Sequence, residues 1–173
     1  MGNLDKFCGC LIGGAAGDAL GYAIEFKRED EIFSEYGKEG ITGYDLILED
    51  DIAEISDDTQ MTLFTAEGLL LAGRKDDSFD YINSIREMYM CWYQTQIEKN
   101  PHKNRNLQCR LLNVSELYNR RCPGMTCMSA IGKVQKEQLR ILSTTVRVVE
   151  ALCVLHLSVC IFAIRPYLMS SLI

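Results

Sequence analysis

Helical segments with short connections dominate this 173-residue chain, and no strand-like alternation of useful length appears before residue 134. Most of the segments place apolar residues three or four apart, and glycine, proline or acidic residues separate them. This pattern predicts an all-α fold, a helical bundle with short connections. The expected helices are residues 6–24, 27–36 and 62–72, a helix capped by Ser78 that stops before Pro101, and residues 104–121.

The spacing also predicts which side chains face the core. We expect Gly37 to end the second helix, Cys122-Pro123-Gly124 to end the last one, and residues 40–55 to form an irregular acidic loop. The residues expected to point inward are Ile32, Phe33, Ile82, Ile85, Tyr89, Trp92, Leu107, Leu111, Val114 and Tyr118.

The first helix is rich in glycine, which costs a helix roughly 1 kcal/mol per residue relative to alanine. We therefore expect another part of the protein to approach its backbone closely, and close helix packing explains most of these glycines. A phosphate-binding loop is a poor alternative, because no strand precedes the segment and no GK[ST] follows it. The glycines are Gly9, Gly13, Gly14, Gly17 and Gly21.

Composition limits the class of protein. With 47% hydrophobic and 24% charged residues, the chain can form one domain with one core. The net charge of -6, without a run of Lys and Arg, argues against a nucleic-acid partner. The eight cysteines form no CxxC pair or zinc spacing and no signal peptide precedes them, so we expect a reduced, cytoplasmic protein.

A membrane partner is not expected. The longest apolar run, residues 151–164, is short for a membrane span and contains His156. An alternative interpretation makes residues 146–164 a C-terminal membrane anchor, but Arg147, Glu150 and His156 interrupt it.

Two adjacent carboxylates stand between hydroxyl residues in Ser56-Asp57-Asp58-Thr59, where a polar loop meets an apolar helical run. Capping of the helix N-terminus is the better explanation for any single acid. Capping explains two neighbouring acids less well, because one cap needs only one acceptor and two adjacent negative charges repel each other. A hard divalent cation such as Mg²⁺ or Ca²⁺ prefers this kind of oxygen-only set.

Two further acids lie within or just after the apolar first helix, namely Asp18 and Glu25. A carboxylate in apolar surroundings tends to have a raised pKa and is a candidate for proton transfer. The alternative is that Glu25 lies on the rim of the fold in contact with water.

Four motifs in order resemble the ADP-ribosylglycohydrolase family. They are Gly9–Gly21 (GCLIGGAAGDALG), Glu25-Phe26, Ser56–Thr62 (SDDTQMT) and Pro123–Cys127 (PGMTC), and the resemblance covers about residues 5–134. It implies an all-α fold that binds two Mg²⁺ ions, or Mn²⁺ in some members. It also implies hydrolysis of the bond between the terminal ribose of ADP-ribose and an acceptor, with an ADP-ribosylated protein or a small ADP-ribose conjugate as substrate.

The resemblance also implies roles for particular residues. Ser56, Asp57 and Asp58 match the family's first metal-ligand cluster, and Glu25 and Asp58 match catalytic positions. Asp18, Gly124 and Thr126 match the substrate side. The chain departs from the family at Met125, where Asn is usual, and it lacks the later glycine-rich segment and the second metal cluster, DxDT.

The tail suggests a reason for these absences. When residues 137–158 are reverse-translated and the codons are read in a shifted frame, the degenerate code permits GTIENPVNNSKGCGGVMRVAPI, which resembles the family's glycine-rich motif. Our hypothesis is a frameshift near residues 134–136. Residues 1–136 would be the N-terminal part of a C-terminally truncated domain, and residues 137–173 an out-of-frame tail in which Cys153, His156 and Cys160 have no functional meaning. Sequencing the gene tests this.

Two functions follow from these expectations. The first is a Mg²⁺-dependent ADP-ribosyl-protein hydrolase, impaired in this chain and exposing apolar faces that promote aggregation. The second is a non-catalytic member of the same fold that acts as a binding or structural module.

Overall fold

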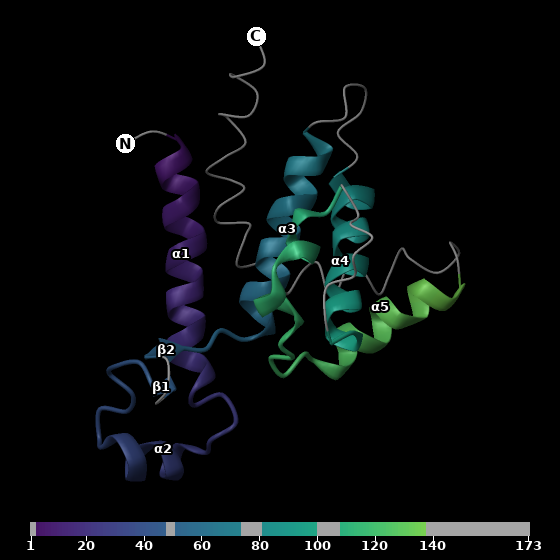
Figure 1. Ribbon diagram of the computed structural model, residues 1–173. Coiled ribbons are helices and arrows are strands. Elements are labelled where there is room, and N and C mark those ends of the chain that lie inside the picture. Colours follow the sequence, from purple (N-terminus) through teal and green to yellow (C-terminus); the bar gives the residue numbers. More distant parts are fainter. Residues whose placement is uncertain (1–2, 48–50, 74–80, 100–107, 138–173) are drawn as a thin grey trace. The chain divides into compact units, whose positions relative to one another are not determined.

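The computed structural model describes residues 3–47, 51–73, 81–99 and 108–137. Within these ranges the secondary structure is almost wholly helical, which confirms the predicted all-α class (Figure 1). The α-helices are α1 (Asn3–Tyr22), α2 (Glu29–Tyr36), α3 (Asp57–Ala72), α4 (Tyr81–Ile97) and α5 (Met125–Glu137). The chain divides into two compact units, Met1–Thr59 and Gln60–Ile173, which are described separately.

The first unit contains α1, α2 and a short hairpin. Figure 1 shows α2 and the hairpin near the C-terminal end of α1. The hairpin pairs β1 (Leu46–Ile47) with β2 (Ile52–Ala53) in antiparallel register. It lies inside the segment that the sequence predicted to be irregular. Strands of two residues are too short to show the alternation by which a strand is recognised.

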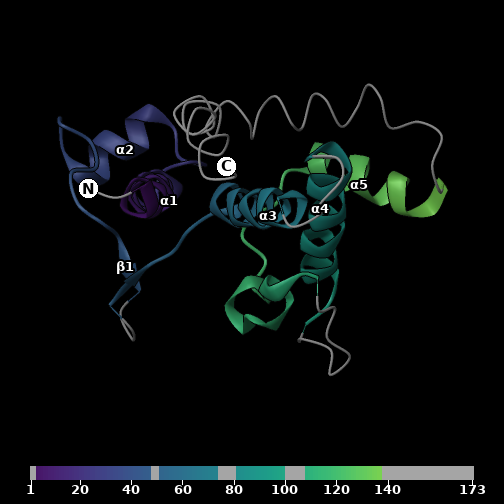
Figure 2. The same cartoon turned by 90° about the horizontal axis from the view of Figure 1, so that it is seen from above.

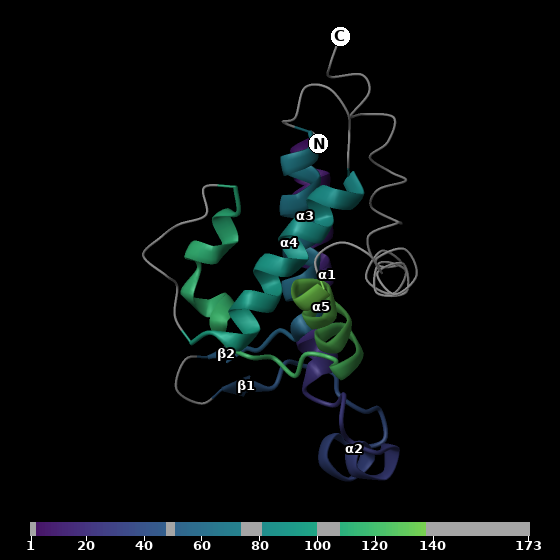
Figure 3. The same ribbon diagram turned by 90° about the vertical axis from the view of Figure 1, so that its right-hand side faces the viewer.

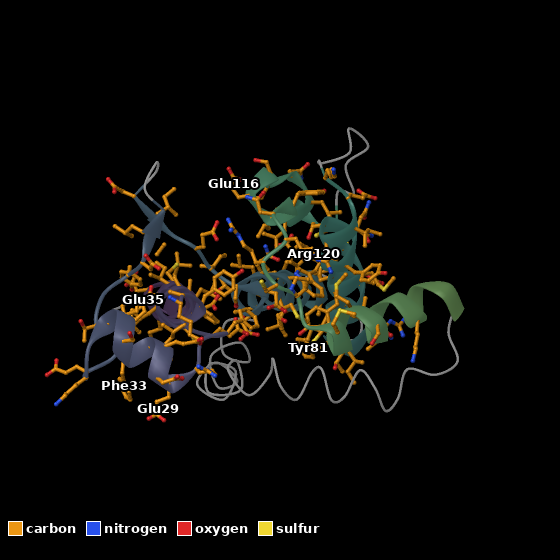
Figure 4. The ribbon with its side chains drawn as sticks, turned by 90° about the horizontal axis from the view of Figure 1, so that it is seen from below. Glu29, Phe33, Glu35, Tyr81, Glu116 and Arg120 are labelled. Atoms are coloured by element: carbon orange, nitrogen blue, oxygen red, sulfur yellow. The ribbon has the colours of Figure 1, made fainter. Side chains whose placement is uncertain are left out.

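The second helix begins and ends as its sequence suggests. Three acidic residues occupy its first turn, where they suit the positive end of the helix. Gly37 ends it, with a φ of 86° that favours glycine, and its N–H donates to the carbonyl of Phe33 at 3.1 Å. Ile32 is half-buried, whereas Phe33 is 45% exposed (Figure 4), so the inward orientation predicted for Phe33 is wrong. Neighbouring helix residues point about 100° apart, so this short helix can partly cover Ile32 and leave Phe33 exposed.

The glycines of α1 do not have the close neighbours that we predicted. A Cβ atom at any of the five would meet nothing within 4 Å among the described atoms. Ala19 is the only buried apolar residue of this unit within residues 4–46 and 51–59. The described part of the first unit therefore has almost no apolar core, and polar contacts stand out among its interactions.

The second unit has the core. Trp92 and Phe64 are completely buried, and Met61 and Met88 surround them in one apolar cluster. Figure 2 shows α4 between α3 and α5, and α4 also packs against two 3-10 helices, η1 (Arg110–Asn113) and η2 (Ser115–Tyr118). Figure 3 shows the green segment of η1 and η2 to the left of α4.

The helix predicted for residues 104–121 is wrong in kind, because the described part forms η1 and η2 instead. Val114, 39% exposed, separates them and donates its N–H to the carbonyl of Leu111 at 3.0 Å. A hydrogen bond between residues three apart closes a 3-10 turn, which is tighter than an α-helical turn. Val114 therefore does not point to the side of the segment on which the α-helical spacing placed it. Leu111 is half-buried and Tyr118 is buried, as predicted.

On α4, Ile85, Tyr89 and Trp92 are buried as predicted, but Ile82 is 67% exposed and the prediction that it faces inward is wrong. Ile82 lies in the first turn, where α4 has no preceding turn to pack beside it. The predicted cap Ser78 and the predicted inward residue Leu107 lie outside the described residues.

The described helices include none that is long and apolar enough to cross a membrane. The alternative anchor at residues 146–164 and the predicted out-of-frame tail at residues 137–173 lie outside the described residues, apart from Glu137, the last residue of α5.

One glycine is required by helix packing. A Cβ atom at Gly68 of α3 would lie 2.7 Å from the Cα of Ile85 on α4, and backbone atoms cannot move aside as a flexible side chain can. We expect Gly68→Ala to lower the free energy of unfolding by about 1–3 kcal/mol, the usual cost of overpacking. Urea denaturation followed by circular dichroism measures it.

Gly13→Ala is the matched control, because a methyl group there meets nothing within 4 Å. It should leave stability unchanged or raise it by up to about 1 kcal/mol through helix propensity. Equal losses for the two variants would contradict the close approach of α3 and α4.

Candidate functional site

Asp18 on α1 binds the start of α3. Its Oδ2 accepts the backbone N–H of Ser56 at 2.9 Å and that of Thr59 at 3.3 Å. Its Oδ1 accepts the hydroxyl of Ser56 at 2.6 Å, and the hydroxyl of Thr59 donates to Oδ2. All of these residues belong to the first unit. Four donors use the main acceptor positions of one carboxylate.

Ser56 is the N-cap of α3. Its Oγ accepts the N–H of Asp58 at 3.1 Å, the usual bond of an N-cap serine. In a capping box, an acid in the first turn of the same helix accepts the N–H of the N-cap residue. Here Asp18, 38 residues earlier in the chain, accepts that N–H instead, together with the N–H of Thr59. A distant acid therefore completes the cap.

The acid that caps the helix, Asp18, differs from the acids at the first two positions of the helix. Asp57 and Asp58 form the first two residues of α3 and suit its positive end. The Asp58 side chain is exposed, and no backbone N–H among the described residues donates to it. The capping that we favoured for single acids is thus performed by Ser56 and Asp18, and the carboxylate of Asp58 remains accessible to a ligand.

Glu25 lies beside this helix start. It follows α1 in a turn, where its N–H donates to the carbonyl of Tyr22 at 3.4 Å. Partial burial raises the pKa of Glu25 above its ordinary value, and the negative charges of Asp58 and Asp18 raise it further. The direction is the one that we predicted for a proton-transfer group, and that role stays a prediction. The alternative position on the rim of the fold is confirmed, because Glu25 is exposed to water.

The remaining predicted residues belong to the second unit. Gly124 precedes α5 and accepts the N–H of Met128 at 3.0 Å, which starts the helix. Thr126 is exposed in its first turn, and Met125, which stands at the family's usual Asn position, is 77% exposed. The first unit thus brings together Asp18, Glu25, Ser56, Asp57 and Asp58, and the roles of Gly124 and Thr126 on the substrate side stay predictions.

Gln60 is a residue whose contribution we did not predict. It is buried, and its Nε2 donates to the carbonyl of Asn119 at 2.9 Å. Its Oε1 accepts the Nε1–H of Trp92 at 3.2 Å and the amide of Gln96 at 2.9 Å. A buried amide with this many partners holds the first turns of α3 in one position. The signal in the sequence was a glutamine inside an apolar helical run.

The oxygen atoms at the start of α3 suit a hard cation. Mg²⁺ is commonly bound by one or two carboxylates while it keeps several waters. Asp57 and Asp58 supply such carboxylates, and the hydroxyl of Ser56 keeps one lone pair after its bonds to Asp18 and Asp58. Within the described residues, however, no three Asp, Glu, His or Cys side chains form a group that could hold a metal.

Loss of the distant cap should be visible in stability. We expect Asp18→Ala to lower the free energy of unfolding by about 2 kcal/mol, because two N–H groups and two hydroxyls lose a charged acceptor. Asp58→Ala removes a neighbouring acid that binds no described N–H, and should cost less than about 1 kcal/mol. Chemical denaturation of both variants measures this, and equal losses would contradict the cap.

The pKa of Glu25 can be measured by carboxyl NMR titration. We expect it above that of an ordinary glutamate, and Asp58→Asn should lower it by removing a nearby negative charge. Because the folded pKa is raised, the contribution of Glu25 to stability is present at low pH and lost as the pH rises through that value. An unchanged pKa of Glu25 in Asp58→Asn would show that the two carboxylates do not interact. Asp45→Asn, on the exposed loop, is the control and should leave the pKa of Glu25 unchanged.

The sequence of this chain matches a known protein family. The family model described as ADP-ribosylglycohydrolase matches residues 2–150. That match includes residues 137–150, and the domain boundary predicted at residue 136 stays a prediction. No solved structure matches the chain.

A curated relative is the ADP-ribosylarginine hydrolase Tri1 of Serratia proteamaculans (strain 568), which is 36% identical over 92 residues. The alignment covers 53% of this chain and 22% of the relative, so the chain corresponds to about a fifth of that protein. Because the family model spans most of the sequence, the chain belongs to the ADP-ribosylglycohydrolase family.

Proposed function

We propose that this chain carries one side of a site that hydrolyses the bond between ADP-ribose and an acceptor, with ADP-ribosylated arginine side chains as the substrate class. One observation carries the proposal. Asp18 and Ser56 satisfy the start of α3, so that the Asp58 carboxylate lies accessible near Glu25. The name of the Serratia relative supports the choice of arginine.

Asp57 and Asp58, together with the hydroxyl of Ser56, are the residues that would hold Mg²⁺ or Mn²⁺. Burial raises the pKa of Glu25 most, and a cation held by these residues would offset the negative charge of Asp58, which raises it further. When bound, such an ion orients ribose hydroxyls and activates water. Asp18 positions the ligands by holding the first turn of α3.

Glu25 is the proposed proton-transfer group. Its raised pKa keeps a fraction of the side chain protonated at a pH where an ordinary glutamate is fully ionised. A carboxyl group of this kind can give a proton to a leaving group or take one from a water at the glycosidic carbon. Cleavage of glycosidic bonds generally uses two carboxylates in different roles, and Asp58 is the second one here.

A second candidate is a non-catalytic protein of the same fold that binds ADP-ribose or a partner. The observation in its favour is that no three acidic, histidine or cysteine side chains of the described residues form a metal group. Such a protein would keep the cap of α3 but would not hydrolyse the bond between ADP-ribose and its acceptor.

Hydrolysis of ADP-ribosylarginine distinguishes the candidates. Because this chain carries one side of the site, we expect slow ADP-ribose release in Mg²⁺ and a loss in EDTA. Asp57→Ala and Asp58→Ala should each reduce turnover about a hundredfold while the helical content stays the same. Disturbing even the outer partners of a metal ligand typically costs 10–100-fold. The control is Asp45→Ala, an exposed acid whose described contact is with the hydroxyl of Tyr36.

Equal turnover in EDTA would contradict the metal's role, and equal turnover in Asp58→Ala would contradict the proposed site. If the folded wild-type chain binds ADP-ribose in calorimetry but releases none from the substrate, the second candidate is correct.

A further inference from the structure

A buried amide, Gln60, lies in the first turn of α3, just after the two acids that begin the helix. Its side chain bonds three groups of the second unit: the carbonyl of Asn119 at 2.9 Å, the indole of Trp92 at 3.2 Å and the amide of Gln96 at 2.9 Å. These groups belong to α4 and to the residue directly after η2. The bonds therefore tie the first turn of α3 to segments that are distant in the sequence.

The two ends of the Gln60 side chain meet groups of opposite kind. The indole Nε1–H of Trp92 can only donate a hydrogen bond, and the carbonyl of Asn119 can only accept one. An amide satisfies both, because it accepts at its oxygen and donates at its nitrogen. A methionine of similar length would satisfy neither group, and an ionised glutamate would satisfy only the indole. The partners of Gln60 thus fix both its position and its orientation.

The second amide of this network is oriented toward Gln60. The Nε2 of Gln96 donates to the oxygen of Gln60 and, at 2.9 Å, to the hydroxyl of Thr95. Its own Oε1 is buried and has no hydrogen-bond partner among the described residues, which destabilises a fold. Turning the Gln96 amide round would place its oxygen against the oxygen of Gln60. The bond to Gln60 therefore decides the orientation of Gln96.

Fixing Gln60 also fixes the directions of the two acids before it. Successive residues of an α-helix point about 100° apart. Asp57, three residues earlier, therefore lies on nearly the same side of α3 as Gln60, whereas Asp58 points away from it. Burial agrees with this placement, because Asp57 is half-buried and Asp58 is exposed. A rotation of the first turn would move both carboxylates, and the bonds of Gln60 oppose that rotation.

We propose that Gln60 is a positioning residue for the cation site: its buried bonds hold the first turn of α3 at the rotation in which Asp57 and Asp58 supply ligands to one Mg²⁺ ion. The inference rests on the proposed function, because it concerns the metal ligands of that site. Asp18 satisfies N–H groups at the start of α3, whereas Gln60 sets the rotation of the turn, so the two residues have different tasks.

The chain offers a matched control on the same helix. Thr65, also completely buried, donates its hydroxyl to the carbonyl of Met61 at 2.8 Å and lies 2.8 Å from the hydroxyl of Tyr89 on α4. Gln60→Met and Thr65→Val therefore each remove a buried polar contact between α3 and α4. They differ in that Thr65 lies about two turns beyond Asp58.

The first measurement needs no cation. Amide hydrogen exchange of the full chain is followed by NMR, with the N–H groups of Asp58 and Thr59 as reporters. Gln60→Met should lower their protection about tenfold, whereas Thr65→Val should leave it within about twofold of the wild type. Wild-type protection of these two groups in folded Gln60→Met would overturn the proposal.

The second measurement is a Mg²⁺ titration followed at the same N–H signals. The dissociation constant should rise about tenfold in Gln60→Met and stay within about twofold in Thr65→Val, because disturbing the partners behind metal ligands typically costs 10–100-fold. The indole signal of Trp92, the single tryptophan, should respond to Mg²⁺ in the wild type and not in Gln60→Met. An equal rise in both variants would overturn the proposal. A wild type that binds no Mg²⁺, with protection lost as expected in Gln60→Met, would instead contradict the proposed function and support the hold of Gln60 on the turn.

Gln60→Glu keeps the test decisive if Gln60→Met does not fold. Burial raises the pKa of a carboxyl group, and the protonated form accepts at one oxygen and donates at the other, as the amide does. Protection of Asp58 and Thr59 should therefore match the wild type at low pH and fall as this carboxyl group ionises. Wild-type protection at a pH where NMR shows the group to be ionised would overturn the proposal.

Discussion

The carboxylate of Asp18 holds the start of α3, and the candidate site depends on that interaction. A helix N-terminus leaves N–H groups without partners inside the helix, and at the start of α3 two acceptors satisfy three of the N–H groups. Ser56 accepts that of Asp58, and Asp18 accepts those of Ser56 and Thr59. The charge also lies at the positive end of the helix, which strengthens the contact.

The cap divides the acids of the first unit between two tasks. Asp18 is fully engaged with donors of the α3 start, whereas Asp58 is exposed and close enough to Glu25 to raise its pKa. The metal site and the proton-transfer group that we propose need carboxylates that a ligand can reach, whereas the helix cap uses a carboxylate whose oxygens are already bonded to N–H and O–H groups. The division explains why the segment contains several acids: Asp18 caps the helix, and Asp58 stays exposed near Glu25. The chain belongs to a family whose name describes hydrolysis at ADP-ribose.

The spacing of apolar residues predicted the helices well where the side chains at that spacing are the ones that pack in the core. The end of α2 at Gly37 and the buried Ile85, Tyr89 and Trp92 on α4 follow from turn chemistry and from helical period. The pattern was wrong for Phe33, which lies in a short helix, and for Ile82, which lies in the first turn of α4. At such positions few neighbouring side chains are available to bury an apolar residue. The pattern was also wrong for residues 108–121, the described part of the predicted helix 104–121, because apolar residues three apart suit a 3-10 turn as well as an α-helix.

The sequence by itself determined the helical class, the family, and the kinds of side chain at the site, because these depend on residue type and on short spacings. The tertiary structure alone decided which acid caps α3, because Asp18 and Ser56 are 38 residues apart and no local spacing records their contact. The same holds for Gln60, whose partners lie on α4 and directly after η2. Hydrogen bonds between distant segments form only once the backbone has brought donor and acceptor within about 3 Å of each other.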